Sequence, residues 1–171
     1  MKNIKLIWGS DTGATEEIVM IMERGFLPVI NAIEEVDEVQ GNPEHWNTHD
    51  VYMIGLPTWY DGELQSSWED YFEEFKTIDF TNKKVCIFGL GDQEGYGEYF
   101  VDGIGILAEV IIKNGGTIIG KTSTEGYDYE ESKAEMEEGV FFGLVLDEDN
   151  QDELTSERVY NWIDQLKEEL K

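Results

Sequence analysis

The sequence predicts an α/β protein in which a parallel, five-stranded sheet is covered by helices on both faces. Three observations predict this fold. Short apolar runs end at Gly or Pro and alternate with helical patterns along the 171-residue chain. The runs are apolar on both faces, which is typical of buried parallel strands. Right-handed crossovers between them would give a three-layer, doubly wound sheet. The length suits a single domain over residues 1–171.

The apolar runs indicate where the strands lie. Four clear runs cover residues 3–8, 50–56, 84–88 and 117–119. A weaker candidate covers residues 27–30, where Pro28 indicates an edge strand or a strand start. The later run 139–146 is expected to continue the last strand, after a polar and acidic excursion that interrupts it.

Four helices are expected from apolar residues spaced three and four apart. The first ends at Gly25, and the last is N-capped by Thr155 or Ser156. In the helix expected over Glu63 to Lys76, the aromatic residues on one face form an aromatic stripe that is interpreted as core packing. They are Trp68, Tyr71, Phe72 and Phe75. The expected helices are Thr12 to Arg24, Glu63 to Lys76, Tyr99 to Asn114 and Thr155 to Leu170.

The composition excludes several classes of protein. The chain has 12 Lys and Arg against 38 Asp and Glu, a net charge of −26, which would repel nucleic acid and anionic lipid. A content of 40% hydrophobic residues is too high for an acidic disordered tail. The N-terminus shows neither a signal segment nor a membrane span, so a cytoplasmic protein is expected.

Cysteine and histidine give no sign of a metal site. The one cysteine, Cys86, lies in an apolar run and is expected to be buried in a strand, which suits a reducing compartment. His45 and His49 are four residues apart, a spacing that can bind metal on a helix, but no thiolate or firm third ligand is near them. They are expected to be solvated loop histidines.

The loops after three of the strands carry the candidate ligand-binding residues, because ligands of open α/β sheets bind beyond the carboxyl ends of the strands. The first loop, residues 9–16, offers three hydroxyls and the N–H groups of a helix N-terminus, which suit a phosphate. A hydroxyl-rich N-cap is the alternative. The loop lacks the Lys of a Walker A motif and the second glycine of a Rossmann fingerprint.

The other two loops carry aromatic side chains. Trp59 and Tyr60 stand at the tip of the loop 57–63, where a flat ligand or a partner would cover them; the alternative is that both rings fold back on the core. The loop 89–99 has four glycines and adds Tyr96 at the same end of the sheet.

Taken together, these loops resemble those of the flavodoxin family, and specifically of its long-chain members. Residues 10–15 match the phosphate motif T/S-x-T-G-x-T, and residues 57–59, 62–65 and 91–96 resemble the two flavin loops. Residues 123–128, 143–151 and 154–155 resemble the long-chain insertion and the segment after it. The resemblance implies the strand order 2-1-3-4-5, a last strand interrupted by the insertion, and non-covalently bound FMN.

The resemblance also implies roles for individual residues. Trp59 and Tyr96 would sandwich the isoalloxazine, Asp92 would meet its pyrimidine edge, and Asp149 would meet the ribityl chain. The full set expected to bind the cofactor is Ser10, Asp11, Thr12, Gly13, Ala14, Thr15, Pro57, Thr58, Trp59, Tyr60, Asp61, Gly62, Leu90, Gly91, Asp92, Tyr96, Tyr99 and Asp149.

Some residues depart from the family pattern. Ala14 stands where many long-chain members have Lys, and residues 6–23 contain no Lys or Arg. A phosphate would therefore be held by neutral donors and the helix end. Leu90, Tyr99 and Val101 replace hydrogen-bonding side chains near the pyrimidine edge.

By the same resemblance, the protein is a one-electron carrier rather than an enzyme, a ferredoxin substitute whose FMN cycles between semiquinone and hydroquinone. Carboxylates on the flavin loops should oppose reduction and lower the potential. The expected partners are redox proteins with basic docking faces. Donors would be similar to ferredoxin-NADP reductase or photosystem I, and acceptors would be ferredoxin-dependent reductases. No nucleic acid, metal or membrane insertion is expected, and the protein is expected to be a monomer.

Two alternatives remain open. A quinone or NAD(P)H reductase of the same fold would need a substrate pocket on the flavin, yet the flavin loops have no basic residue to hold the phosphates of a nicotinamide nucleotide. An acidic mimic of DNA would use the charge but leave the three loops unexplained. A receiver domain is excluded, since the strand that ends at Pro57 has no acceptor Asp there.

Overall fold

The computed structural model describes residues 2–26 and 29–171 and contains the predicted parallel sheet. The main strands lie in the order β2-β1-β3-β5-β10, so the predicted order 2-1-3-4-5 is confirmed. Their bounds are Ile30–Glu35 (β2), Ile4–Trp8 (β1), Val51–Trp59 (β3), Lys84–Leu90 (β5) and Leu144–Leu146 (β10). A short strand, β6 (Thr117–Ile118), pairs with the start of β5, and β10 pairs with its end.

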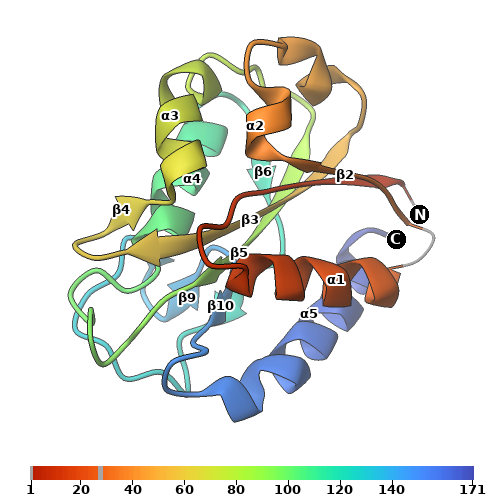
Figure 1. Cartoon of the computed structure of the whole chain (residues 1–171). Helices are drawn as coiled ribbons and strands as arrows, with labels where there is room; N and C mark the ends of the chain where they lie inside the picture. Colours follow the sequence, from red (N-terminus) through yellow and green to blue (C-terminus); the bar gives the residue numbers. More distant parts are fainter. Residues whose placement is uncertain (1, 27–28) are drawn as a thin grey trace.

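Helices cover both faces of the sheet (Figure 1). One face carries α1 (Ala14–Phe26) and α5 (Thr155–Glu169). The other carries α2 (Val36–Val39), α3 (Ser66–Phe75) and α4 (Asp102–Lys113). Two short 3-10 helices, Pro43–Asn47 and Asp152–Leu154, complete the set. None of the helices in the described residues is long and apolar enough to cross a membrane.

The sheet separates two hydrophobic cores. In β3, Tyr52 and Ile54 point to the core under α3 and α4, while Met53 points to the core under α1 and α5. This alternation follows from the two-residue period of a strand. Cys86 in β5 is fully buried, and Trp68, Tyr71 and Phe75 of the aromatic stripe lie in the first core, with Phe72 partly buried against it, as predicted.

The insertion interrupts the last strand and forms a small antiparallel sheet of its own. Its strands are β7 (Thr122–Ser123), β8 (Glu135–Glu137) and β9 (Val140–Phe141), in the order β7-β9-β8. The prediction that the whole run 139–146 continues the last strand is therefore wrong, since only residues 144–146 do so. Between the two sheets the chain passes close to β5, because a Cβ at Gly143 would lie 2.4 Å from the Ile87 carbonyl oxygen.

Several predicted helix boundaries are wrong, including the start of α1, which lies at Ala14 and not at Thr12. Helix α1 continues through Gly25, where a Cβ would lie 2.4 Å from Ile163 Cδ1, so this glycine permits close packing against α5 and does not end the helix. Helix α3 begins at Ser66, because Glu63–Leu64 form β4, antiparallel to β3. Helix α4 begins at Asp102, because Val101 before it has a positive φ of 47°.

The predicted caps of the last helix are also wrong. Helix α5 follows directly on a 3-10 helix, and its cap residue, Leu154, makes no side-chain capping bond. The Thr155 hydroxyl instead donates to the Glu148 carboxylate.

At the β2 edge of the sheet, the structure shows where the weak strand candidate and the two histidines lie. Residues 27–28 of the weak strand candidate lie outside the described residues, and β2 begins at Ile30, on the edge of the sheet. His45 lies in a 3-10 helix with its Nδ1 atom 2.6 Å from Glu34 Oε2. His49 Nε2 lies 2.8 Å from Asn31 Oδ1, so the two histidines have different partners. In the described part of the chain no group of three or more His, Cys, Asp or Glu is arranged to hold a metal ion.

Candidate functional site

The three candidate loops meet at the carboxyl edge of the sheet and line one cleft of about 270 Å³. They follow β1, β3 and β5, which are neighbours in the sheet. The segment after β10 closes the cleft with Glu148 and Asp149. The predicted residues that the structure brings together here are Thr12, Ala14, Pro57, Thr58, Trp59, Tyr60, Leu90, Gly91, Asp92, Tyr96 and Asp149.

The first loop presents unused hydrogen-bond donors at the start of α1. Gly13 takes a positive φ of 88° and its N–H donates to Ser10 Oγ at 2.9 Å, which shapes the turn. Within the described residues, the backbone N–H groups of Thr12, Ala14 and Thr15 have no partner. The Thr15 hydroxyl is also buried without a partner. An unpaired buried polar group costs about 1–3 kcal/mol, so this end of the cleft is built to meet an acceptor.

Asp11 belongs to the first loop but does not line the cleft. Its carboxylate accepts hydrogen bonds from Ser66 Oγ at 2.7 Å and from Gln65 Nε2 at 3.0 Å. Burial would raise the pKa of Asp11, but these bonds outweigh it and hold the pKa below its usual value. Asp11 therefore ties the loop to the start of α3 as an anion.

The second loop is a tight hairpin turn that presents two aromatic rings. Tyr60 has a positive φ of 41° and Gly62 one of 81°. Tyr60 is 59% exposed, and its ring meets the Tyr96 ring edge-on, with centroids 6.1 Å apart. The Trp59 ring lies 6.3 Å from that of Tyr60, so the three rings are contiguous.

The base of this hairpin is fixed to α4. A Cβ at Gly62 would lie 2.6 Å from Asp102 Oδ2, so the turn packs directly on that buried side chain. Thr58 Oγ1 accepts a hydrogen bond from Gly103 N at 2.9 Å. The position of the two rings therefore depends on the N-terminus of α4.

The third loop is organised by Asp92. Its Oδ1 accepts from Gly95 N at 2.7 Å, Asn150 Nδ2 at 2.8 Å and Glu94 N at 3.1 Å. Burial would raise the pKa of Asp92, but these bonds outweigh it and lower the pKa. The loop therefore closes around a carboxylate that stays ionised.

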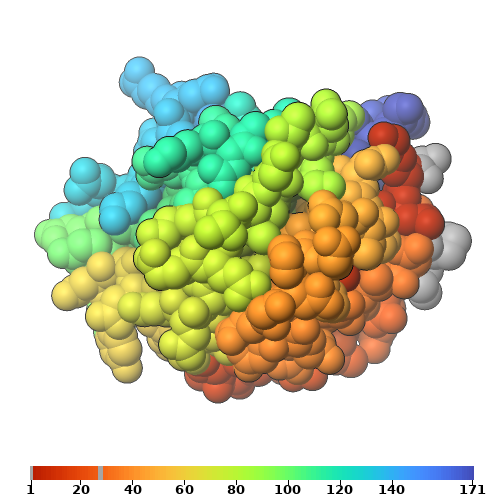
Figure 2. Space-filling view, turned by 90° about the horizontal axis from the view of Figure 1, so that it is seen from above, coloured from red at the N-terminus to blue at the C-terminus, as the bar shows by residue number. Residues whose placement is uncertain are grey.

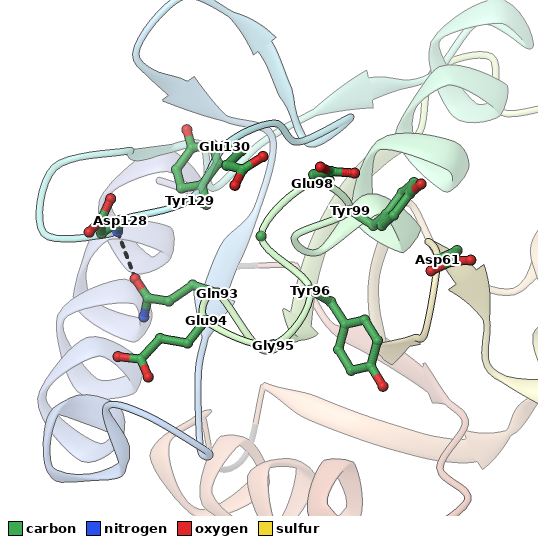
Figure 3. Close-up of a pocket in the computed structure, with 11 residues that line it drawn as sticks. Asp61, Gln93, Glu94, Gly95, Tyr96, Glu98, Tyr99, Asp128, Tyr129 and Glu130 are labelled. Atoms are coloured by element: carbon green, nitrogen blue, oxygen red, sulfur yellow. Dashed lines mark hydrogen bonds between the residues drawn. The ribbon is translucent and has the colours of Figure 1, made fainter.

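Sequence reasoning missed a second carboxylate that holds the same loop. Asp147 is fully buried and accepts hydrogen bonds from Gln93 N at 3.0 Å and Gln93 Nε2 at 2.7 Å. Gln93 Oε1 in turn accepts from Asp128 N at 2.7 Å (Figure 3). The third loop, the insertion and the segment after β10 are thus joined through one glutamine. No feature of the sequence marks an acidic residue after an apolar strand as facing inward.

The charged side chains that line the cleft are all acidic. Asp92, Glu148 and Asp149 line it, and no Lys or Arg is among the described residues that do. Partial burial, and then the charges of Asp92 and Asp147, raise the pKa of Asp149. Glu148 was also missed, because only the fold brings it to the cleft.

The remaining predicted residues lie around the cleft and not on its wall. Ser10, Gly13, Thr15 and Gly62 underlie the loops, whereas Asp61 and Tyr99 line a neighbouring hollow of about 560 Å³ (Figure 3). Tyr96 borders both spaces. The neighbouring hollow is rich in carboxylates, contributed by Asp61, Glu94, Glu98, Asp128 and Glu130.

Comparison with known proteins places this arrangement in a family. A sequence model described as Flavodoxin matches residues 6–162. The chain is 42% identical over 170 residues to a flavodoxin of Haemophilus influenzae, covering 99% of this chain and 97% of that protein. The chain belongs to the flavodoxin family. The resemblance seen in the loops is confirmed.

Other flavodoxins agree with this assignment across the whole chain. A flavodoxin of Nostoc sp. is 44% identical over 169 residues, with 99% of this chain and 98% of that protein covered. The crystal structure of the Fusobacterium nucleatum flavodoxin bound to flavin mononucleotide matches with a TM-score of 0.89 and 36% identity, covering 99% of each chain. As in that comparison structure, the fold of this flavodoxin is a central sheet flanked by helices.

Proposed function

We propose that this flavodoxin binds FMN in the cleft between its three loops and carries single electrons between redox proteins. When bound, FMN supplies the one-electron chemistry, and the protein sets its energy. The family consists of electron-transfer proteins, and the proposal treats this member as a carrier and not as an enzyme. We further propose that residues 1–171 form one FMN-binding domain and that the protein acts as a monomer in the cytoplasm.

The unpartnered hydroxyl of Thr15 is the observation that carries the proposal. Together with the free N–H groups of Thr12, Ala14 and Thr15, it offers neutral donors at a helix N-terminus. Those donors suit a phosphate, which would gain from the helix dipole without a cationic side chain. The donor set of the first loop therefore fits the phosphate end of FMN.

The aromatic side chains are proposed to hold the flavin ring. Trp59 and Tyr96 are assigned to its two faces, where stacking contributes about 0.5–1.5 kcal/mol per pair beyond the buried area. Tyr60 contacts both of these rings, and its side chain is exposed enough to move aside. Leu90, Gly91 and Asp92 are assigned to the remaining edge, and Asp149 to the chain that joins ring and phosphate. The other proposed residues contact FMN or support the loops that do. They are Ser10, Asp11, Gly13, Pro57, Thr58, Asp61, Gly62 and Tyr99.

The carboxylates around the cleft are proposed to tune the cofactor. Glu148 and Asp149 line the cleft beside Asp92, and Asp61 and Glu94 line the hollow next to it. Like charges at short range disfavour added negative charge, and the low-dielectric wall of a cleft strengthens the effect. We therefore propose that the protein is an electron carrier whose bound FMN has a low reduction potential.

The same carboxylates are proposed to guide partners. Those of the neighbouring hollow line it together with Tyr96, which also borders the cleft, and a basic face would be attracted there. Suitable partners are donors similar to ferredoxin-NADP reductase or photosystem I, and ferredoxin-dependent reductases as acceptors. Such attraction weakens as salt is added.

Titration of the apoprotein with FMN and with riboflavin tests the proposal. We expect FMN to bind with one-to-one stoichiometry and more tightly than riboflavin, which lacks the phosphate. Thr15→Val should reduce that difference, whereas Thr117→Val, at an exposed position of β6, should not. Equal affinities for the two ligands would contradict the phosphate assignment. Consumption of NADPH without a partner would favour the reductase alternative, and a protein that takes up no FMN would favour the DNA mimic.

A further inference from the structure

Another concave surface lies between α3 and α4, on the face shown in Figure 2, where α3 is yellow-green and α4 bluish green. It is a groove of about 350 Å³, within the size range of small-molecule sites. None of the residues that line it lines the FMN cleft. The groove therefore needs an explanation of its own.

The floor of the groove is apolar. It is formed by Phe72 of α3 and by Ile106 and Val110 of α4. Val110 is 9% exposed, and the other two are half-buried. Covering these side chains with an apolar group would remove apolar surface from water, which is favourable.

The rim of the groove is cationic, which is unusual in this chain. Lys76, Lys113 and Lys133 all line it, three of the 12 Lys and Arg in a protein of net charge −26. Glu109 is the one acidic residue among those lining it. Lys76 lies 2.6 Å from Glu73, but Lys113 and Lys133 form no ion pair with any part of the chain that the structure describes. Two lysines on this rim are therefore available to an anion.

Helix capping explains part of this arrangement. Lys76 follows the last residue of α3 and Lys113 ends α4, positions that favour a cation because of the helix dipole. Lys133 belongs to the insertion and lies on no helix. The third positive charge therefore has no capping role.

The backbone at Lys133 is held firmly on α4. Its N–H donates to Asp102 Oδ1 at 2.8 Å. A Cβ at Gly105 would lie 2.1 Å from the carbonyl oxygen of Lys133, so the insertion and α4 are in direct contact here. The Ser132 hydroxyl donates to the Phe100 carbonyl oxygen. A site whose walls are already in place loses little entropy when a ligand binds.

We propose that this groove binds a small amphipathic carboxylate. The apolar body of the ligand packs on Phe72 and Val110, and its carboxylate pairs with Lys113 and Lys133. The charge of the rim selects an anion, and the apolar floor selects one with a hydrocarbon body. The proposal concerns the α3–α4 face alone and does not depend on FMN.

Titration of the FMN-saturated protein with octanoate, followed by calorimetry and by NMR, tests this proposal. We expect saturable one-to-one binding and much weaker binding of the neutral octan-1-ol. Lys113→Glu or Lys133→Glu should weaken octanoate binding by about tenfold or more. The control Lys84→Glu makes the same change of charge at an exposed position of β5 outside this groove and should leave the affinity close to that of the unmodified protein.

Three results would overturn the proposal. These are no saturable binding of octanoate, equal binding of octanol, or an equal loss of affinity in the Lys84→Glu control. Unchanged flavin absorbance in each variant would show that the FMN site is intact, so a loss of octanoate binding would be local to the groove.

Discussion

The buried carboxylate of Asp147 accepts two hydrogen bonds from Gln93, one from its backbone N–H at 3.0 Å and one from its side-chain amide at 2.7 Å. Through this pair the segment after β10 sets the conformation of the loop that carries Tyr96. The third loop of the cleft is therefore held by a residue that does not itself line the cleft.

Removing this carboxylate should weaken both the fold and the site. Asp147→Ala leaves the two donors of Gln93 buried without a partner, so we expect a loss of about 3 kcal/mol in the free energy of unfolding. Urea unfolding measures the loss, and FMN titration should show weaker binding because Tyr96 is no longer held. Asp128→Asn is the control, since only the backbone N–H of Asp128 joins this network and its side chain is exposed. Equal stability of the two variants would contradict the role given to Asp147.

A partly buried ion pair between β1 and the edge strand β2 should make stability depend on pH. Lys5 is 3% exposed, and its Nζ lies 2.9 Å from Glu34 Oε2, which is also 2.6 Å from His45 Nδ1. Burial would raise the pKa of Glu34, but bonds from Lys5 and His45 outweigh it and lower the pKa below the ordinary value of 4.5. Because the folded-state pKa is lowered, the stabilisation is present above pH 4.5 and is lost as the pH falls through the lowered value.

Glu34→Gln tests this relationship. At pH 7 we expect a loss of about 2 kcal/mol in the free energy of unfolding, since the charge of Lys5 remains buried without its partner. The difference from the unmodified protein should shrink as the pH falls below 4.5 toward the lowered pKa of Glu34. Glu23→Gln, on the exposed side of α1, should change stability little at either pH. A difference that stays constant down to pH 3 would show that the ion pair is not its cause.

The strained backbone at Tyr60 predicts an unusual order of stabilities. A φ of 41° is unfavourable for any residue with a Cβ, by about 1–2 kcal/mol. Tyr60→Gly and Tyr60→Ala both remove the exposed ring, but only glycine relieves the strain. We expect the glycine variant to be the more stable by about 1 kcal/mol, the reverse of the order in regular structure. Thermal unfolding of the two apoproteins gives the comparison, and a more stable alanine variant would contradict it.

Much of the fold could be predicted because strands and helices alternate with clear apolar patterns. The errors fall where a residue has two possible uses. A glycine such as Gly25 often ends a helix. Here its lack of a side chain instead lets α1 approach Ile163 of α5. Glu63 continues a helical pattern, but hydrogen bonding to β3 draws it into a hairpin.

The candidate site could be predicted in part for a related reason. The loops that carry Thr12, Trp59 and Asp92 follow adjacent strands, so topology alone brings them together. The inward orientation of Asp147 and the lysines around the α3–α4 groove depend on contacts between segments far apart in the sequence. Such contacts leave no local pattern, and only the folded chain reveals them.

The central claim is that this flavodoxin carries one electron at a time on FMN held in the three-loop cleft. Its most direct test is the absorption spectrum of the FMN-saturated protein during stepwise reduction at known potentials. We expect two separate one-electron steps, with the second at a potential more negative than that of free FMN, because the surrounding carboxylates oppose added charge. Uptake of both electrons in a single step at the potential of free FMN would contradict the account.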